Sequence, residues 1–585
     1  MSIFGPTWST SPREFDVIRE RDVRIPVRRG YELDCQVFRP DGPGPFPVIL
    51  GLAPYPIDDQ AANHVPVPMR YPNAHMEAGD PYFYARRGYV HVLGNLPGTG
   101  ASGGEFDHMG PEAIDAVEDA IAWVAQQPWS DGNVGMFGMS YYGMVQVLVA
   151  MRQPPALKAI FCPFSVTDQF RDTYYKGGIF GYAFLKGWSV ALRRARVKPM
   201  MAQAIGRENF LALVEQAKAE PENQLVPTIM EVLENVDDPV NEFLAEFIVN
   251  PTYGAHYEPR NVDYSVGCTV PGYFGACWGI YGLHLNAAFR SYVNWSGDRR
   301  VTVGPPAYLD RPITQYQDES LRWFDHYLKG MDTGLDTQPP VQVFIDDANV
   351  WRTGDTWPLP QTRFTSFYLH GDGAAGDGLL FEHEPWPDST PDAIADSPSE
   401  RGTATYTTPA FRDDIELCGP MLLNLWASTT GTEALVYASV YKVDAAGSER
   451  LLTRGWLRAS MRRVDAAASE PWLPVHEMRA REPLEPGVVY PLAIDIRPYG
   501  IAFESGSRLR LKIRTTDHGD PNPDILSNHA VGLIAGAQDA VVSIHHDPQH
   551  PSHLVLPITA GNIINTFLSG GRLEPLENAW TGGGH

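Results

Sequence analysis

One serine stands in a sequence context that could make it a nucleophile. Ser140 lies in Asn133–Val145, where a strand-like stretch ends at Gly138 and a helical stretch follows. A sharp strand-to-helix turn forces its central residue into strained backbone geometry and needs small residues nearby, here Gly138 and Gly143. Such a turn lifts the serine hydroxyl above the sheet edge. It also places the amide of Tyr141 at a helix N-terminus, where it can stabilise an oxyanion.

The spacing of this turn leaves two interpretations open. Gly143 comes one place later than the second glycine of the G-x-S-x-G nucleophile elbow. Ser140 is therefore either a nucleophile or part of an ordinary βα turn, as found in any α/β protein. A nucleophilic serine also requires a base, which is normally a histidine oriented by a carboxylate.

The segments that would position Ser140 alternate between strand and helix patterns. Apolar runs at Pro47–Leu52 and Gly88–Gly94 have the length and composition of strands buried on both faces. The second run leads into the glycine-rich turn Pro97–Gly104. Apolar residues at helical spacing come next, namely Ile114, Val117, Ile121 and Val124. Strands joined through helices in this order predict a parallel sheet.

The character of the chain changes at Thr167. Thr167–Asn250 is rich in aromatic residues and then in helix-forming ones, so we expect an inserted helical cap over the site. Strand–helix alternation resumes at Thr269. It ends with the amphipathic helix Glu319–Lys329, which Gly330 stops.

Beyond Pro339 the sequence consists of short alternating segments separated by turns. This texture predicts an antiparallel β-sandwich. The Asp- and Pro-rich stretch Trp386–Pro398 is expected to form a long surface loop. The predicted strands include Val341–Ile345, Phe367–His370, Met421–Trp426, Leu435–Tyr441 and Arg508–Ile513.

The segment Gly138–Gly143, together with the preceding Gln127–Gly135, resembles the corresponding stretch of the cocaine-esterase-like (CocE/NonD) hydrolases, which are relatives of the X-prolyl dipeptidyl aminopeptidases. The resemblance runs through most of the chain, which makes it more specific than an elbow motif. Its further parts are Pro54-Tyr55, Pro97–Gly104, Tyr174–Gly178, Trp323–Gly330, Ser505–Lys512 and Asp520–Pro523.

The resemblance implies an α/β-hydrolase domain with an inserted helical cap and a C-terminal all-β jelly-roll sandwich, in agreement with the segment patterns. The expected bounds are 1–165 and 256–338 for the α/β-hydrolase domain, 166–255 for the cap and 339–585 for the sandwich.

The resemblance also implies an oxyanion hole. In the family it is formed by a tyrosine hydroxyl and by the amide after the nucleophile, which correspond here to Tyr55 and Tyr141. Tyr55 follows a predicted strand, at the edge where α/β sheets place their ligands. The alternative for Tyr55 is an aromatic residue of a surface loop. Trp278, Phe170 and Tyr174 are expected to contact the substrate, although the cap aromatics also suit the core of the cap.

The base side of the triad departs from the family pattern. The position of the family's carboxylate carries Ile280, and the position of its histidine carries Tyr308. Shifting the alignment does not recover the pattern, because Thr269–Asn286 contains no Asp or Glu and Val301–Leu309 contains no His. A site of this kind can polarise a carbonyl but activates its serine poorly.

His284 and Tyr308 are the candidates for a replacement base. His284 follows Ile280 by four residues, which is one helical turn, so its imidazole can face the same cleft. The alternative for His284 is a hydrogen-bonded structural residue. Tyr308 has a reference pKa of about 10 and suits a donor or acid better than a base. Asp58 and Asp310 are further carboxylates in nearby loops.

Three functions remain open. The first is an enzyme that acts through Ser140 on an ester, an amide or another acyl or carbonyl small molecule. The second is a non-hydrolytic enzyme on the same scaffold, such as a lyase, cyclase or acyltransferase. The third is a ligand-binding pseudoenzyme, because fold does not determine function.

Composition excludes several other classes of protein. The chain has 585 residues and a formal net charge of −24, which repels phosphate backbones and anionic lipid heads. We therefore expect a small-molecule acyl or carbonyl substrate and neither a nucleic acid nor a membrane as partner. A homodimer is one option, and the sequence leaves the oligomeric state open. Since no signal peptide and no long apolar run is evident, we expect a cytoplasmic protein.

The cysteine and histidine residues do not predict a metal site. The five cysteines are widely spread and form no C-x-x-C pair, so we expect them reduced and mostly buried. His545-His546 is interpreted as a solvated strand face rather than a metal site. We expect no cofactor and no catalytic metal.

Overall fold

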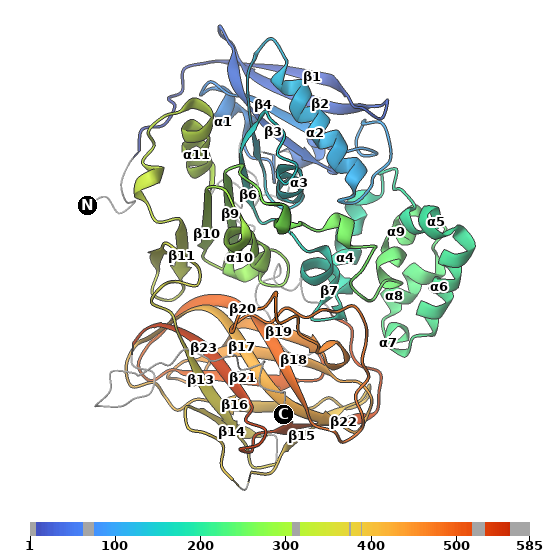
Figure 1. Cartoon of the computed structure of the whole chain (residues 1–585), viewed down its shortest axis with the longest axis vertical. Helices are drawn as coiled ribbons and strands as arrows, with labels where there is room; N and C mark the ends of the chain where they lie inside the picture. The colour runs from blue at the N-terminus through green and yellow to red at the C-terminus, as the bar shows by residue number, and fades with distance from the viewer. Residues whose placement is uncertain are drawn as a thin grey trace.

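The computed structural model describes residues 8–61, 75–306, 316–373, 376–387, 389–517 and 533–561. Figure 1 shows an α/β part at the top, an all-β part below it and a group of helices projecting to one side. Two of the predicted site residues, Tyr308 and Asp310, lie outside the described residues, as does the segment Asp520–Pro523.

The first part is built on a ten-stranded sheet of order β1-β2-β4-β3-β5-β6-β9-β10-β11-β12. From β4 to β11 the neighbouring strands run parallel, as the strand–helix alternation predicts. The strands are β1 (Val17–Pro26), β2 (Glu32–Pro40), β3 (Phe46–Ala53), β4 (Val90–Asn95), β5 (Ser130–Phe137), β6 (Leu157–Pro163), β9 (Gly272–Cys277), β10 (Arg299–Gly304), β11 (Val341–Ile345) and β12 (Val350–Gly354).

Five helices accompany this sheet, and their buried residues have the predicted spacing. The four apolar residues singled out in α2 are all buried. Helix α11 ends where Gly330 adopts the left-handed conformation, with a φ of 66°. The helices are α1 (Pro81–Ala85), α2 (Pro111–Ala125), α3 (Tyr141–Ala150), α10 (Leu285–Asn294) and α11 (Gln317–Lys329).

The predicted cap is present and predominantly helical. It contains the π-helical turn η3 (Gln169–Tyr174), a short hairpin β7 (Tyr175–Lys176) and β8 (Ile179–Phe180), and six helices. Figure 1 shows α5 to α9 as the group that projects from the side of the molecule. The helices are α4 (Tyr182–Ser189), α5 (Met200–Ile205), α6 (Arg207–Ala219), α7 (Pro221–Gln224), α8 (Pro227–Glu234) and α9 (Pro239–Ile248).

The C-terminal part is an eleven-stranded antiparallel-rich sheet of order β15-β22-β17-β20-β19-β18-β21-β16-β14-β13-β23, and it closes on itself because β17 also pairs with β23. A jelly-roll-like sandwich is therefore confirmed. Its strands are β13 (Arg363–His370), β14 (Asp377–Phe381), β15 (Asp392–Asp396), β16 (Thr403–Thr407), β17 (Ile415–Thr429), β18 (Leu435–Val443), β19 (Glu449–Arg458), β20 (Tyr490–Phe503), β21 (Arg508–Arg514), β22 (Ala540–His545) and β23 (His553–Ala560).

Two predictions about segments were wrong. Val341–Ile345 does not belong to the sandwich: as β11 it pairs parallel with β10 and extends the first sheet. Part of the expected loop Trp386–Pro398 is strand β15, which pairs with β22. Asp392 within this strand is buried and accepts hydrogen bonds from the Tyr406 hydroxyl and from His546 Nε2. These partners override the poor strand propensity of aspartate.

His546 and the five cysteines are buried. His546 is 1% exposed beside Asp392, so the interpretation of His545-His546 as a solvated strand face fails for His546. All five cysteines are buried and carry free thiols. No helix in the described part of the chain is long and apolar enough to cross a membrane.

Candidate active site

Ser140 lies at a strained turn between β5 and α3. Its φ of 57° and ψ of −122° fall in a region that non-glycine residues rarely adopt. The turn needs its glycines because the backbone is crowded there. A Cβ on Gly138 would lie 2.5 Å from Tyr142 Cβ, and one on Gly143 would lie 3.2 Å from the Pro163 carbonyl oxygen. The geometry is that of a nucleophile elbow.

The Ser140 side chain is half-buried, and within the described ranges no hydrogen bond involves its hydroxyl. The hydroxyl is therefore not bonded to Tyr55. The Tyr141 amide belongs to the first turn of α3, where N–H groups have no acceptor within the helix. An amide in this position can donate to an oxyanion formed at a carbonyl that Ser140 attacks.

Tyr55 lies just beyond the C-terminal end of β3 and is largely buried. Its hydroxyl oxygen accepts a hydrogen bond of 3.0 Å from Nε1 of Trp188, which belongs to the cap helix α4. Its backbone carbonyl accepts one of 2.6 Å from the Asn95 side chain at the end of β4. The rings of Tyr55 and Tyr141 are 6.3 Å apart and meet edge to face. The structure thus brings the two predicted oxyanion residues together.

A buried histidine that sequence reasoning missed joins the elbow to the cap. His108 Nδ1 lies 3.2 Å from the Tyr141 hydroxyl, and its Nε2 lies 3.1 Å from the Tyr174 hydroxyl. Burial lowers the pKa of His108 to about 3, so its imidazole is neutral at pH 7. The only signal in the sequence is its place shortly after the glycine turn Pro97–Gly104, which pointed to no partner.

His284, a candidate for the base, lies beside Ser165. Its Nδ1 is 3.0 Å from the carbonyl oxygen of Ser165. A Cβ on Gly143 of α3 would lie 3.3 Å from Ser165 Cβ, so the partner of His284 borders the helix that Ser140 begins. A carbonyl only accepts, so Nδ1 carries the proton and Nε2 is the basic nitrogen. Burial, with a smaller contribution from Lys176, lowers the pKa of His284 to about 4, although the hydrogen bond to the Ser165 carbonyl opposes this shift.

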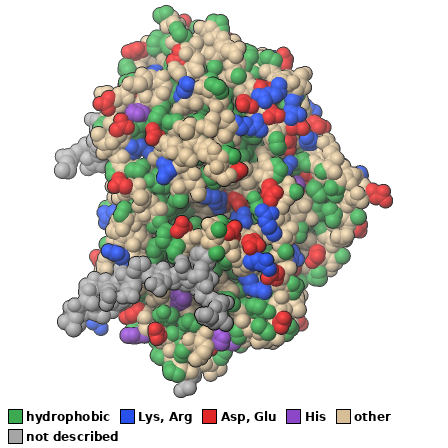
Figure 2. All heavy atoms as spheres, in the orientation of Figure 1, with side chains coloured by type: hydrophobic (Ala, Val, Ile, Leu, Met, Phe, Trp, Pro, Cys, Tyr) green, Lys and Arg blue, Asp and Glu red, His purple; other side chains and the backbone are tan. Residues whose placement is uncertain are grey.

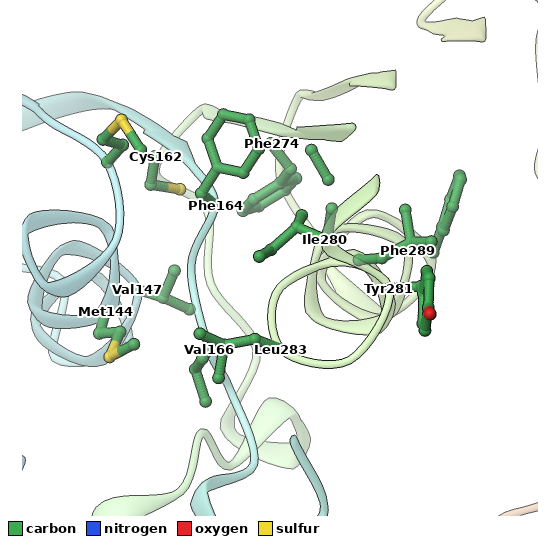
Figure 3. Packing of buried hydrophobic residues seen from close by; sticks show 14 of the residues in the cluster. Met144, Val147, Cys162, Phe164, Val166, Phe274, Ile280, Tyr281, Leu283 and Phe289 are labelled. Carbon is green, nitrogen blue, oxygen red and sulfur yellow. The ribbon is translucent and has the colours of Figure 1, made fainter. Parts of the chain in front are cut away.

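Ile280, the predicted position of the family's carboxylate, has hydrophobic neighbours. Ile280 ends the turn η7 (Trp278–Ile280) and is 3% exposed. Figure 3 places it within a cluster of hydrophobic side chains, which includes Phe164, Phe274 and Leu283. An ionised carboxylate at this position would lose its hydration without gaining a partner among these groups.

Two carboxyl groups are candidates for an acidic partner at the elbow: that of Glu77, which lies next to it, and that of Asp58, which the sequence suggests. Glu77, which sequence reasoning missed, accepts a hydrogen bond from the Met139 amide through its backbone, and burial raises the pKa of its carboxyl to about 8. It is therefore mostly protonated at pH 7 and supplies little negative charge. Asp58 is exposed and forms ion pairs with Arg19 and Arg21, at 3.5 and 3.6 Å. These arginines compensate its charge.

The three residues expected at the substrate are fully buried. Trp278 Nε1 donates to the Phe344 carbonyl in β11 at 2.7 Å. The ring of Phe170 stacks on Tyr175, with centroids 5.0 Å apart, and the ring of Tyr174 stacks on Phe247 at 3.8 Å. These contacts match the alternative in which the cap aromatics form the core of the cap.

One group of side chains in the C-terminal part has ligand types that suit a metal. Candidate ligand atoms of His545, Asp547 and His550 lie within 4.8 Å of one another. Their polar atoms already have protein partners: His550 Nδ1 lies 3.0 Å from Asp547 Oδ2, and His545 Nε2 lies 2.9 Å from the Ser428 hydroxyl. The group belongs to the β22–β23 region of the C-terminal sheet and contributes nothing to the elbow.

Comparison with known protein families matches the chain in two parts. Residues 29–306 match the family described as X-Pro dipeptidyl-peptidase (S15 family). Residues 333–555 match the X-Pro dipeptidyl-peptidase C-terminal non-catalytic domain. The elbow, Tyr55 and the cap all fall within the first match.

Individual relatives confirm the resemblance. Cocaine esterase from Rhodococcus sp. is 28% identical over 92% of this chain and 98% of its own length. The structure of a CocE/NonD family hydrolase from Staphylococcus aureus has a TM-score of 0.77 at 22% identity, over 93% of this chain and 94% of the other. An aminopeptidase from a marine sediment archaeon, Thaumarchaeota archaeon, has a TM-score of 0.72 at 17% identity, over 96% and 99% of the two chains.

Proposed function

This chain belongs to the S15 family of X-Pro dipeptidyl-peptidase-like proteins, whose members include serine esterases and peptidases, and from that premise we propose that it is an acyl-processing enzyme that uses Ser140 as its nucleophile. The observation that carries the proposal is the strained backbone of Ser140, at a half-buried elbow with Tyr55 and Tyr141 beside it. Strain of this kind persists where the surrounding structure holds it for function.

The substrate in this proposal is an ester, an amide or a related carbonyl compound of small size. The Ser140 hydroxyl attacks the carbonyl carbon, and the negative charge that develops on the oxygen is stabilised by the Tyr141 amide and the Tyr55 hydroxyl. Removing one such donor in a well-studied protease costs about 10²- to 10³-fold in kcat. The leaving group departs, and an acyl group remains on Ser140.

In this proposal His284 Nε2 accepts the proton of Ser140. The Ser165 carbonyl fixes the tautomer of His284 by accepting from Nδ1, a role that a carboxylate plays in the ordinary triad. A carbonyl carries no full charge, so it stabilises the imidazolium less than a carboxylate does. The lowered pKa of His284, about 4, expresses the same disadvantage. We therefore expect slow hydrolysis of unactivated substrates.

A second candidate is transfer of the acyl group to an acceptor other than water. The apolar surroundings of Ile280 favour it, because they leave His284 without a carboxylate partner, and activation of water in the second half-reaction depends on this same weak base. An acyl-enzyme that reacts slowly with water persists long enough to meet an amine or alcohol.

The experiment that tests the proposal is labelling with a fluorophosphonate probe, which reacts only with an activated serine. We expect one phosphonyl group per chain, found by peptide mass spectrometry on the peptide that contains Ser140, and none in Ser140→Ala. Ser165→Ala is the matched control. Ser165 is a buried serine near the elbow and should carry no label, so this variant should be labelled on Ser140 like the wild type. Unlabelled wild-type protein would refute the proposal and favour a ligand-binding role.

A further inference from the structure

The two contributors to the proposed oxyanion hole touch the same cap side chain. Trp188 Nε1 donates to the Tyr55 hydroxyl oxygen at 3.0 Å. The Trp188 ring also stacks on the ring of Tyr141, with centroids 6.2 Å apart and planes at 12°. Tyr55 follows β3 and Tyr141 begins α3, whereas Trp188 comes from α4 of the cap. The cap therefore reaches both residues through a single indole.

The direction of the Trp188–Tyr55 hydrogen bond is unambiguous. An indole N–H only donates, so the tyrosine oxygen is the acceptor and must direct its own proton elsewhere. Two consequences follow for Tyr55. First, the Tyr55 O–H cannot point toward Trp188. Second, the O–H becomes a stronger donor, because hydrogen bonds in a chain polarise one another.

The indole itself is held by several neighbours. His108 meets it edge to face at 5.5 Å, and Phe243 of α9 lies 6.1 Å from it. The same His108 lies within hydrogen-bond distance of the Tyr141 and Tyr174 hydroxyls. An aromatic group packed on several sides keeps its N–H direction without a large further loss of rotamer entropy.

We propose that Trp188 is a positioning residue, which orients the Tyr55 hydroxyl as an oxyanion donor and makes the donor geometry depend on the cap. The inference rests on the proposed function of Ser140 and Tyr55 and deepens it. It assigns to α4 a role in catalysis that is distinct from covering the site, because the Trp188 N–H occupies one acceptor direction of the Tyr55 oxygen and so restricts where the Tyr55 O–H can point.

A double-mutant cycle on the rate of phosphonylation tests the proposal without knowledge of the natural substrate. We expect Tyr55→Phe to slow the labelling of Ser140 by about 10²-fold. Trp188→Phe should slow it by about tenfold, the rate equivalent of one neutral hydrogen bond. The double variant should be no slower than Tyr55→Phe alone, because Trp188 acts through Tyr55. Trp295→Phe is the matched control, since it removes an indole donor to the Val270 carbonyl in the α/β domain.

An unchanged labelling rate in Trp188→Phe, or effects of the two substitutions that multiply in the double variant, would overturn the proposal. A readout independent of activity covers the case in which wild-type protein takes no label and the proposed function itself fails. In spectra of ¹⁵N-tryptophan-labelled protein, the Trp188 indole signal should shift and exchange its proton faster in Tyr55→Phe. An indole signal that is the same in both proteins would overturn the inference on its own.

Discussion

Ile280 and His284 lie four residues apart in the chain and have different surroundings. Ile280 has hydrophobic neighbours, whereas His284 has a carbonyl partner that orients its ring. The resemblance predicts that Ile280 occupies the position of the family's carboxylate, but the sequence does not reveal what surrounds that position. The structure adds that this surrounding is apolar, which leads to two predictions for single residues.

Replacing Ile280 by aspartate alone should not restore a triad. We expect Ile280→Asp to lower the free energy of unfolding by about 2–5 kcal/mol, since the new carboxylate would be buried without a partner. Ile280→Val is the control and should cost about 0.5–1.5 kcal/mol, as one buried methyl group is lost. Urea unfolding of the three proteins measures both values. Equal midpoints for Ile280→Asp and wild type would show that the position is more polar than the packing indicates.

His284 should affect the rate of acylation and its dependence on pH. If its Nε2 is the base, His284→Gln should slow the acylation of Ser140 by about 10²-fold or more. The folded pKa is about 4, so the neutral form dominates above that value. The acylation rate of wild type should therefore be flat from pH 5 to 8 and fall as pH drops through 4. Stopped-flow measurement with an activated ester gives the profile, and an inflection near pH 7 would assign the base to another group.

At the scale of elements, the hairpin β7–β8 ties the cap to the C-terminal sheet. Gly177 has a φ of 57°, and a Cβ there would lie 2.0 Å from the Trp456 carbonyl oxygen in β19. The Gly177 carbonyl accepts from the Arg458 amide at 2.7 Å. The turn therefore requires glycine for its backbone conformation and for its close approach to β19.

Substitution of this glycine should loosen the contact between cap and C-terminal sheet. We expect Gly177→Ala to reduce the free energy of unfolding by about 2–4 kcal/mol, through steric overlap and an unfavourable φ. Gly187→Ala in the nearby helix α4 is the control. A Cβ there meets nothing within 4 Å, so the change should stabilise by about 0.5–1 kcal/mol. Thermal unfolding of both variants measures the difference, and destabilisation by Gly187→Ala as large as that by Gly177→Ala would contradict this explanation.

The elements that could be predicted are those whose pattern is local. Apolar runs predict the buried strands around residues 47–52 and 88–94. Helical spacing predicts the helix 319–329, and glycines predict the elbow at Ser140. The strand Asp392–Asp396 does not, because its aspartates are poor strand formers that tertiary partners satisfy. Val341–Ile345 alternates like a sandwich strand, and only its pairing with β10 assigns it to the first sheet.

The candidate site divides in the same way. Ser140, Tyr55 and Tyr141 were identified from motif and resemblance. His108 and Glu77 were not, because single buried polar residues acquire their meaning from partners distant in sequence, such as Tyr174 for His108 and Met139 for Glu77.

At the scale of the whole molecule, buried neutral histidines should make the protein sensitive to acid. Burial lowers the pKa of six of them to about 3–4, whereas each takes up a proton at about 6.5 when unfolded. The unfolded state then binds more protons than the folded state between these values, so stability falls as pH decreases from about 6.5 to 4. The residues are His75, His91, His108, His256, His284 and His476.

Two buried glutamates act in the opposite direction. Burial raises the pKa of Glu77 and Glu246 to about 8. Between pH 4.5 and 8 these two carboxyl groups therefore lower the free energy of unfolding as pH rises. Being fewer, they offset only part of the histidine effect. We expect a clearly lower urea midpoint at pH 5 than at pH 7. A midpoint at pH 5 equal to or above that at pH 7 would contradict the assignment of neutral buried histidines.

The visible face of the molecule carries charges of both signs. Figure 2 shows acidic and basic side chains interspersed over the visible face, with no broad area of basic residues on it. The formal net charge of −24 is therefore not offset on this face by a basic patch that would attract a polyanion. The chemistry that we propose lies where the α/β domain and its cap meet, at Ser140, Tyr55 and Trp188.

The central claim is that this site can acylate its serine but deacylates slowly because its base side is weak. Mixing the protein with 4-nitrophenyl acetate and quenching in acid after seconds tests the claim directly. Nitrophenolate leaves without protonation, whereas release of the acetyl group requires activated water. We predict an acetyl adduct on the peptide that contains Ser140, accumulating toward one per chain, and none in Ser140→Ala. Fast turnover without an adduct, or acetylation of another residue only, would contradict the account.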